Sequence, residues 1–369
     1  MTGAQIEIQL IAVLTAVSCS LPGVFLVLQR KAMLSDAISH TVLLGIVLGF
    51  FLVGDLSSPF LVIGAALVGV LTVSLVAVIE RTRLVKVDAA IGLVFPVLFS
   101  IAVILISVYA GNVHLDTDVV LVGEIAFAPF DRLMIFNQDV GPRGLWAMSG
   151  TLILNLVFIL LFYKELKLTS FDAGLAAALG FLPMVLHYVL MSLVSITVVT
   201  AFDIVGSVLV VALMIVPAAT AFLLVDDLKS MITSSMCIGA LSALGGYWLA
   251  RVLDASIAGA MASTAGVIFM VALLFAPRRG LVAAARLRKA QSQEFAITML
   301  TAHLLNHEHS SDADFENSVS HLGIHMRWQP EFAKRIVEQA VRMKLIKQQG
   351  DQLALTDLGR NHANQEFIQ

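Results

Sequence analysis

The hydrophobic positions of this chain fall into long uninterrupted runs, separated by short polar connections. A helix that crosses a bilayer needs roughly 20 mostly apolar residues, and nine stretches reach or approach that length. They lie at about 5–28, 38–54, 58–79, 89–110, 146–163, 182–201, 204–225, 231–250 and 256–276. The pattern therefore predicts an all-α polytopic membrane protein with eight or nine transmembrane helices. The sixth and seventh runs almost touch near Phe202–Asp203, which predicts a tight hairpin or a broken helix there.

Composition and charge support a membrane protein and indicate its orientation. The chain is 59% hydrophobic and 13% charged, whereas soluble domains average about 25% charged residues. Two cysteines in apolar runs exclude a disulfide framework. Because basic residues favour the cytoplasmic side, nine spans place the N-terminus outside and the C-terminus in the cytoplasm. The basic residues in alternate connections are Arg30, Lys31, Arg81, Arg83, Lys86, Lys164, Lys167, Lys229, Arg278 and Arg279.

The composition changes after Pro277, which predicts a separate C-terminal part. We expect a membrane domain at 1–280, a basic juxtamembrane linker helix at 281–292 and a small cytoplasmic α+β domain at 293–369. Apolar periodicity predicts helices in "EFAITMLTAHLLNH" and "PEFAKRIVEQAVRMKLI". A turn at Gly350-Asp351, a short strand and a terminal helix are expected to follow.

Asp36 and His40 stand where the second apolar run begins. Residues four apart lie on one face of a helix, and a carboxylate with an imidazole suits first-row divalent ions. Ionisable groups at membrane depth are functional candidates. The pair is therefore a candidate metal site. The alternative is structural: Asp36 caps the helix, and His40 bonds a backbone carbonyl at the membrane interface.

Several motifs in order resemble the permeases of metal-type ABC importers, which carry manganese, zinc or iron. They are "SDAISHTVLLGIVLG", "KELKLTSFDAGLAAALG" at 164–180 and "DIVGSVLVVALMIVPAATAFLL" at 203–224. "NVHLDTDVVLVGEIAF" at 112–127 is similar to the manganese and iron branch. The resemblance covers about residues 5–280. The tail, chiefly "VRMKLIKQQGDQLALTDLGRNHA", resembles the winged-helix domain of iron-dependent repressors.

The resemblance implies a permease subunit, not an enzyme, in a bacterial plasma membrane. Asp36 and His40 would form an ion site for Mn²⁺ or Fe²⁺, ahead of Zn²⁺, with no permanently bound cofactor. The implied partners are cytoplasmic ATPases, an extracytoplasmic metal-binding protein, a second permease copy or paralogue, and membrane lipid. Because the chain has no G-x-x-x-x-G-K-[ST] loop, ATP would bind on the partner. The residues implied in ATPase coupling are Ser170, Phe171, Asp172 and Leu175; the alternative is a structural loop.

Each of the other polar residues has a functional interpretation and an ordinary structural one. His114, Asp116, Asp118 and Glu124 form either an acidic outer vestibule or an ordinary solvated loop. Asp203 either lines the pathway or caps the seventh helix. In the tail, His303, His307, His321 and His325 repeat the i,i+4 spacing, which fits metal sensing or a polar surface with solvated histidines.

Two functions of other classes compete with the importer permease. One is a membrane-anchored, metal-responsive regulator that acts through the tail. The acids and bases of the tail nearly balance, so nucleic-acid binding is not expected. The other is a proton-coupled metal carrier, which the small number of ionisable residues deep in the spans disfavours.

Overall fold

The computed structural model describes residues 3–54, 58–109, 125–135, 138–308, 310 and 313–366. The chain divides into two compact units, Met1–Gly280 and Leu281–Gln369. Each unit has its own hydrophobic core.

The first unit is a helical bundle, which confirms the prediction of a polytopic, all-α membrane protein. In the described part of the chain, nine helices are long and apolar enough to cross a membrane. They are α1 (Gly3–Leu28), α2 (Met33–Val53), α3 (Pro59–Arg81), α4 (Val87–Tyr109), α6 (Arg143–Leu161), α9 (Pro183–Val205), α10 (Ser207–Leu224), α11 (Leu228–Leu253) and α12 (Ile257–Phe275). Helix α2 begins at Met33, earlier than the apolar run suggests, so Asp36 and His40 lie inside it.

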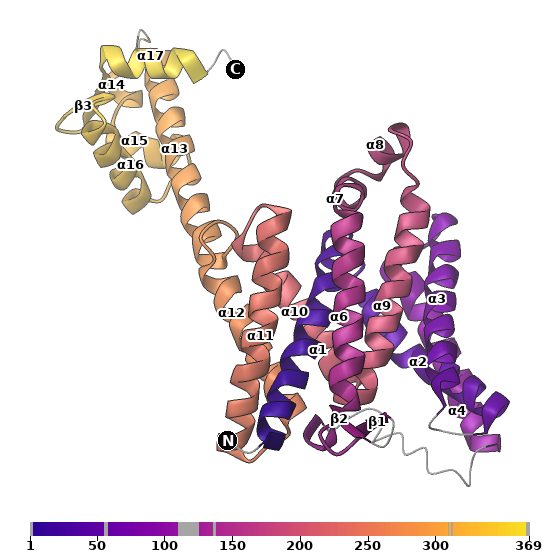
Figure 1. Ribbon diagram of the computed structural model, residues 1–369. Helices are drawn as coiled ribbons and strands as arrows, with labels where there is room; N and C mark the ends of the chain where they lie inside the picture. Colours follow the sequence, from indigo (N-terminus) through magenta and orange to yellow (C-terminus); the bar gives the residue numbers. More distant parts are fainter. Residues whose placement is uncertain are drawn as a thin grey trace. The chain divides into compact units, whose positions relative to one another are not determined.

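The two ends of the bundle carry different connections (Figure 1). One end, the hairpin end, holds the N-terminus, the short helix η1 (Ile125–Phe127) and the antiparallel pair β1 (Arg132–Ile135) and β2 (Gln138–Pro142). The opposite end, the basic end, holds α7 (Tyr163–Phe171), α8 (Ala173–Ala178) and the Arg30–Lys31 connection. Successive spans therefore run in alternate directions between these two ends.

Close helix contacts in the bundle depend on glycine. At Gly23 of α1, an added Cβ would lie 1.9 Å from the carbonyl oxygen of Met214 in α10. Small residues let helix backbones approach in this way, and van der Waals packing then stabilises a bundle in lipid. Asn155 adds a polar contact, because its amide donates to the Ser18 carbonyl at 3.2 Å and to Thr197 Oγ1 at 2.9 Å. These bonds connect α6 with α1 and α9.

Helix α2 packs closely on α3. A Cβ at Gly45 would lie 2.4 Å from Ala65 Cα, and one at Gly49 would lie 3.1 Å from Leu61 Cα. The buried hydroxyls of Thr41 and Thr72 are 2.8 Å apart across the same contact. The position of α2 is therefore set by backbone contact with α3.

The junction between α9 and α10 is a single residue, Gly206, with φ 80° and ψ 164°. This backbone conformation is accessible essentially to glycine alone. The predicted hairpin or break between the sixth and seventh runs is therefore a one-residue turn, three residues beyond Asp203.

The second unit contains α13 (Leu281–His307), α14 (Ala313–Glu316), α15 (Val319–His325), α16 (Pro330–Arg342), the hairpin β3 (Ile346–Gln349) and β4 (Gln352–Leu355), and α17 (Asp357–Glu366). Leu300, Ile336 and Leu353 lie in its core. The predicted turn at Gly350-Asp351 joins β3 to β4. The winged-helix resemblance is not supported, because this unit is mostly helical, and its described strands form a single two-stranded sheet.

Candidate metal-binding site and its surroundings

Asp36 and His40 occupy successive turns at the start of α2. The distance from His40 Nε2 to Asp36 Oδ1 is 3.5 Å, and the two side chains are 32% and 35% exposed. The N-cap position of α2 is Ala32, without a side-chain capping bond, so the structure does not support the capping role for Asp36. The pair thus presents a carboxylate oxygen and an imidazole nitrogen side by side on an accessible helix face.

Two aromatic rings of α4 hold the His40 imidazole in place. Phe95 stacks on it with ring centroids 5.7 Å apart, and Phe99 meets it edge-on at 6.0 Å. Sequence reasoning did not identify these rings, because their contact with His40 depends on how α4 packs on α2. They limit the orientations of His40 without occupying its ring nitrogens.

The pair lies nearer to the basic end than to the hairpin end. His40 is seven residues from Met33, or about 10 Å along the axis at 1.5 Å per residue. At the same end, Lys31 Nζ pairs with Glu80 Oε2 at 3.1 Å and connects the α1–α2 connection to α3. The pair is therefore displaced from the middle of its span.

Among the described residues, Asp36 and His40 alone would offer an ion two protein ligands. In the described residues, no group of three or more His, Cys, Asp or Glu side chains is placed to hold a metal ion. Two ligands would hold an ion only weakly, which suits an ion in transit better than an ion that stays bound.

The predicted coupling residues lie around the junction of α7 and α8. Asp172 Oδ1 accepts the Leu175 N–H at 2.9 Å and caps α8, which is a structural role. Phe171 and Leu175 are 64% and 49% exposed, so they present apolar surface at the basic end. The Ser170 hydroxyl is buried and does not contribute to this exposed surface.

Asp203 lies near the hairpin end of α9, in a cavity of about 400 Å³ that Asp131, Arg143 and Thr200 also line. Its side chain is exposed to this cavity. The N-cap of α10 is Gly206, without a side-chain capping bond, so the structure does not support the capping role of Asp203. The cavity places Asp203 beside a water-accessible space, as a pathway residue requires.

The hairpin beside this cavity is held by charged contacts. Arg132 Nε lies 2.5 Å from Asp139 Oδ2, and Arg132 Nη1 lies 3.5 Å from Glu7 Oε2. The hydrogen bond from Arg132, together with that from the Gly141 N–H, holds the pKa of the Asp139 carboxyl below its usual value. The contacts connect the hairpin to the start of α1.

The remaining residues that the sequence suggested as site residues lie between His114 and Glu124 and in the tail. His114, Asp116, Asp118 and Glu124 lie outside the described residues. In the tail, the His303 and His307 rings lie 4.5 Å apart, His307 pairs with the Glu316 carboxylate, and His321 contacts Phe315. The side chain of His325 is not described. A tail metal site stays a prediction.

The chain matches the model of the ABC 3 transport family over residues 5–301. It is 46% identical to the "Zinc transport system membrane protein TroD" of Treponema pallidum (strain Nichols), covering 96% of both chains. It is 51% identical to the "Manganese transport system membrane protein MntD" of Bacillus subtilis (strain 168), over 73% of this chain and 91% of that protein. A solved structure, "PsaBC from Streptococcus pneumoniae in complex with Fab", is similar with a TM-score of 0.62 and 30% identity, over 76% of this chain and 94% of that one.

Proposed function

The chain belongs to the ABC 3 transport family, and from this premise we propose that it moves a divalent transition-metal ion past Asp36 and His40. It is a membrane permease subunit of a metal-type ABC transporter and not an enzyme. The observation that carries the proposal is the adjacent carboxylate and imidazole on a partly exposed helix face. We place the basic end in the cytoplasm, because it gathers most of the lysines and arginines of the connections.

Two copies of the permease, or one copy and a paralogue, would surround the ion. Each would contribute one carboxylate and one imidazole, and together these four ligands suit Mn²⁺, Fe²⁺ or Zn²⁺. Oxygen and nitrogen ligands without a thiolate favour an ion that is released again, as conduction requires. The accessibility of Asp36 and His40 supports a site that faces a partner subunit.

The energy would come from separate ATPase subunits on the basic end. Phe171 and Leu175 are the exposed apolar side chains that support a contact there. Because Asp172 caps α8, it would keep that helix folded while the ATPase subunit pushes on it. An extracytoplasmic metal-binding protein would deliver the ion at the hairpin end, where Asp203 lies in the outer cavity.

The proposal also concerns which divalent ion the permease transports. The resemblance of residues 112–127 favours manganese or iron over zinc, whereas of two relatives one is named as a zinc transport protein and the other as a manganese transport protein. The two ligand types accept all three ions. Uptake measured with each ion in competition would test the order.

The C-terminal unit is proposed to act as a regulatory or docking domain near the ATPases. This unit has 10 basic and 10 acidic residues, so it lacks the positive surface that nucleic-acid binding needs.

Metal uptake by Asp36→Ala and His40→Ala variants tests the proposed site. We expect uptake to fall to background with normal amounts of protein in the membrane, and Asp88→Ala is the matched control. Asp88 is also a first-turn acid of a spanning helix at the basic end, but it lies on α4. Undiminished uptake of manganese, iron and zinc by both variants would contradict the site. Uptake that needs a proton gradient and no ATPase would favour the carrier alternative.

A further inference from the structure

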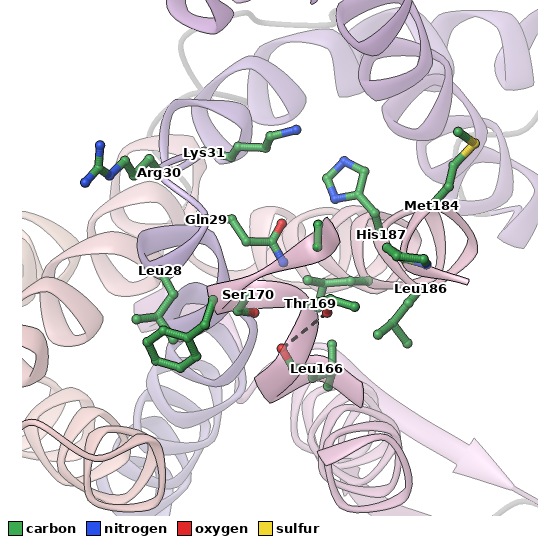
Figure 2. Close-up of a pocket in the computed structure, with 14 residues that line it drawn as sticks. Leu28, Gln29, Arg30, Lys31, Leu166, Thr169, Ser170, Met184, Leu186 and His187 are labelled. Carbon is green, nitrogen blue, oxygen red and sulfur yellow. Dashed lines mark hydrogen bonds between the residues drawn. The ribbon is translucent and has the colours of Figure 1, made fainter. Parts of the chain in front are cut away.

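A second cavity lies at the basic end, between the end of α1, the α7–α8 segment and the start of α9 (Figure 2). Its volume is about 670 Å³. The proposed transport of a metal ion does not use this cavity, and sequence reasoning did not predict it.

The polar part of the lining offers hydrogen-bond donors and positive charge. Gln29, Arg30, Lys31 and His187 line the cavity, and no aspartate or glutamate among the described residues does. Figure 2 shows the Gln29 amide, from the turn after α1, and the His187 ring, from α9, coming from different segments. Thr169 donates to the Glu165 carbonyl at 2.8 Å, so its hydroxyl hydrogen is not available to a ligand. This donor set, without a carboxylate in the lining, disfavours a metal cation and favours an anion.

The charged side chains around the cavity also give it a net positive charge. Lys31 is paired with Glu80, which lies outside the lining and offsets that one charge. Arg30 is exposed at the rim, and Arg81 reaches the cavity wall, where its Nη2 lies 3.1 Å from Met184 Sδ. Arg30 and Arg81 therefore remain as an excess of positive charge.

The other part of the lining is aliphatic and continues onto exposed apolar surface. Leu28, Leu186 and Leu190 line the cavity. On the first turns of α9, Met184 and Val185 are 55% and 54% exposed, and Leu182 just before them is 70% exposed. A ligand that fits both surfaces has an anionic group attached to an apolar chain.

We propose that this cavity binds the phosphate group of an anionic phospholipid, with an acyl chain lying along the exposed start of α9. Basic pockets at the cytoplasmic ends of transmembrane helices bind such headgroups, since the cytoplasmic leaflet carries the anionic lipid. The orientation of the bundle is the point at which this inference rests on the proposed function. A phosphate group also occurs in free anions, so the experiment must separate the two sources.

Bound lipid would act on the coupling segment. Phe171 and Ala173 line the same cavity and belong to the α7–α8 segment proposed to contact the ATPase. A phosphate held between the end of α1 and α9 would fix the inner face of that segment. Anionic lipid is therefore expected to stabilise the contact through which ATP hydrolysis drives transport.

Native mass spectrometry of the full-length chain with added phosphatidylglycerol tests the proposal. We expect phosphatidylglycerol to be retained in preference to phosphatidylcholine, and Arg30→Asn to weaken it about five-fold, the effect of one basic residue near a lipid surface. Asparagine tolerates the left-handed φ of 57° at this position. The matched control is Arg83→Asn, an exposed arginine with φ 56° at the same end that does not line the cavity.

Two results of this experiment would contradict lipid binding in the cavity. Equal loss of phosphatidylglycerol from Arg30→Asn and Arg83→Asn would overturn the proposal, as would displacement of the lipid by excess inorganic phosphate. If Arg30→Asn does not accumulate, Gln29→Leu replaces it and is expected to weaken retention as well. The measurement uses neither metal nor ATPase, so a failure here is distinct from a failure of the transport proposal.

Discussion

The two halves of α2 are held in different ways. The first half carries Asp36 and His40 on a partly exposed face and meets α4 through aromatic rings. The second half meets α3 backbone to backbone at Gly45, and a pair of buried threonine hydroxyls lies where the halves join. Rigid contact in one half fixes the helix, and the softer ring contact in the other half would leave the proposed ligands, Asp36 and His40, room to adjust to an ion.

The largest effect is expected at the rigid half. Gly45→Ala would place a methyl group 2.4 Å from Ala65 Cα, so α2 and α3 must separate. Overpacking of this kind destabilises a fold by about 3 kcal/mol. Gly92→Ala in α4 is the matched control, because nothing lies within 4 Å of its added Cβ. Thermal unfolding in detergent measures both, and equal midpoints would show that α2 is not fixed by this contact.

An intermediate effect is expected at the soft half. Phe95→Leu removes the ring that stacks on His40, and such ring contacts contribute about 1 kcal/mol. We expect the KM for metal uptake to rise about five-fold while unfolding changes little. Phe51→Leu is the control, since Phe51 contacts Tyr109 of the same helix pair at the other end, at 6.2 Å. A similar rise of KM in both variants would mean that His40 is not positioned by the rings.

The smallest effect is expected where the halves join. Thr72→Val keeps the shape but removes the hydroxyl that lies 2.8 Å from Thr41 Oγ1, which costs about 1 kcal/mol of unfolding free energy. Ser74→Ala is the control, because its hydroxyl bonds to the Val70 carbonyl of its own helix. A loss in Ser74→Ala as large as in Thr72→Val would mean that the bond across α2 and α3 adds nothing of its own.

The sequence predicts the spans well, because long apolar runs have few alternatives in lipid. It places the start of α2 too late, since the polar residues of "MLSDAISH" interrupt the apolar run although the helix continues through them. The proposed metal-ligand pair, Asp36 and His40, could be suggested from the sequence because its spacing is local, and its binding of an ion stays a prediction. Phe95 and Phe99 were missed as its neighbours, because the contact between α2 and α4 depends on tertiary packing.

The connections are the least predictable part of the bundle. The hairpin β1–β2 lies in the region 111–145, where neither an apolar run nor a strong alternation exists to indicate strands. Both cavities combine residues from segments far apart in the sequence, such as Gln29 with His187. Spacing along the chain carries no information about such groupings, so they emerge only from the fold.

The single glycine between α9 and α10 has a practical consequence for mapping the protein in a membrane. Gly206 at φ 80° leaves no loop in which a tag or cleavage site can be placed without moving two buried helices. Exposed connections tolerate insertions far better. The three exposed residues Asp254, Ala255 and Ser256 join α11 to α12 at the same end of the bundle. A reporter inserted there would reveal which side of the membrane the hairpin end faces.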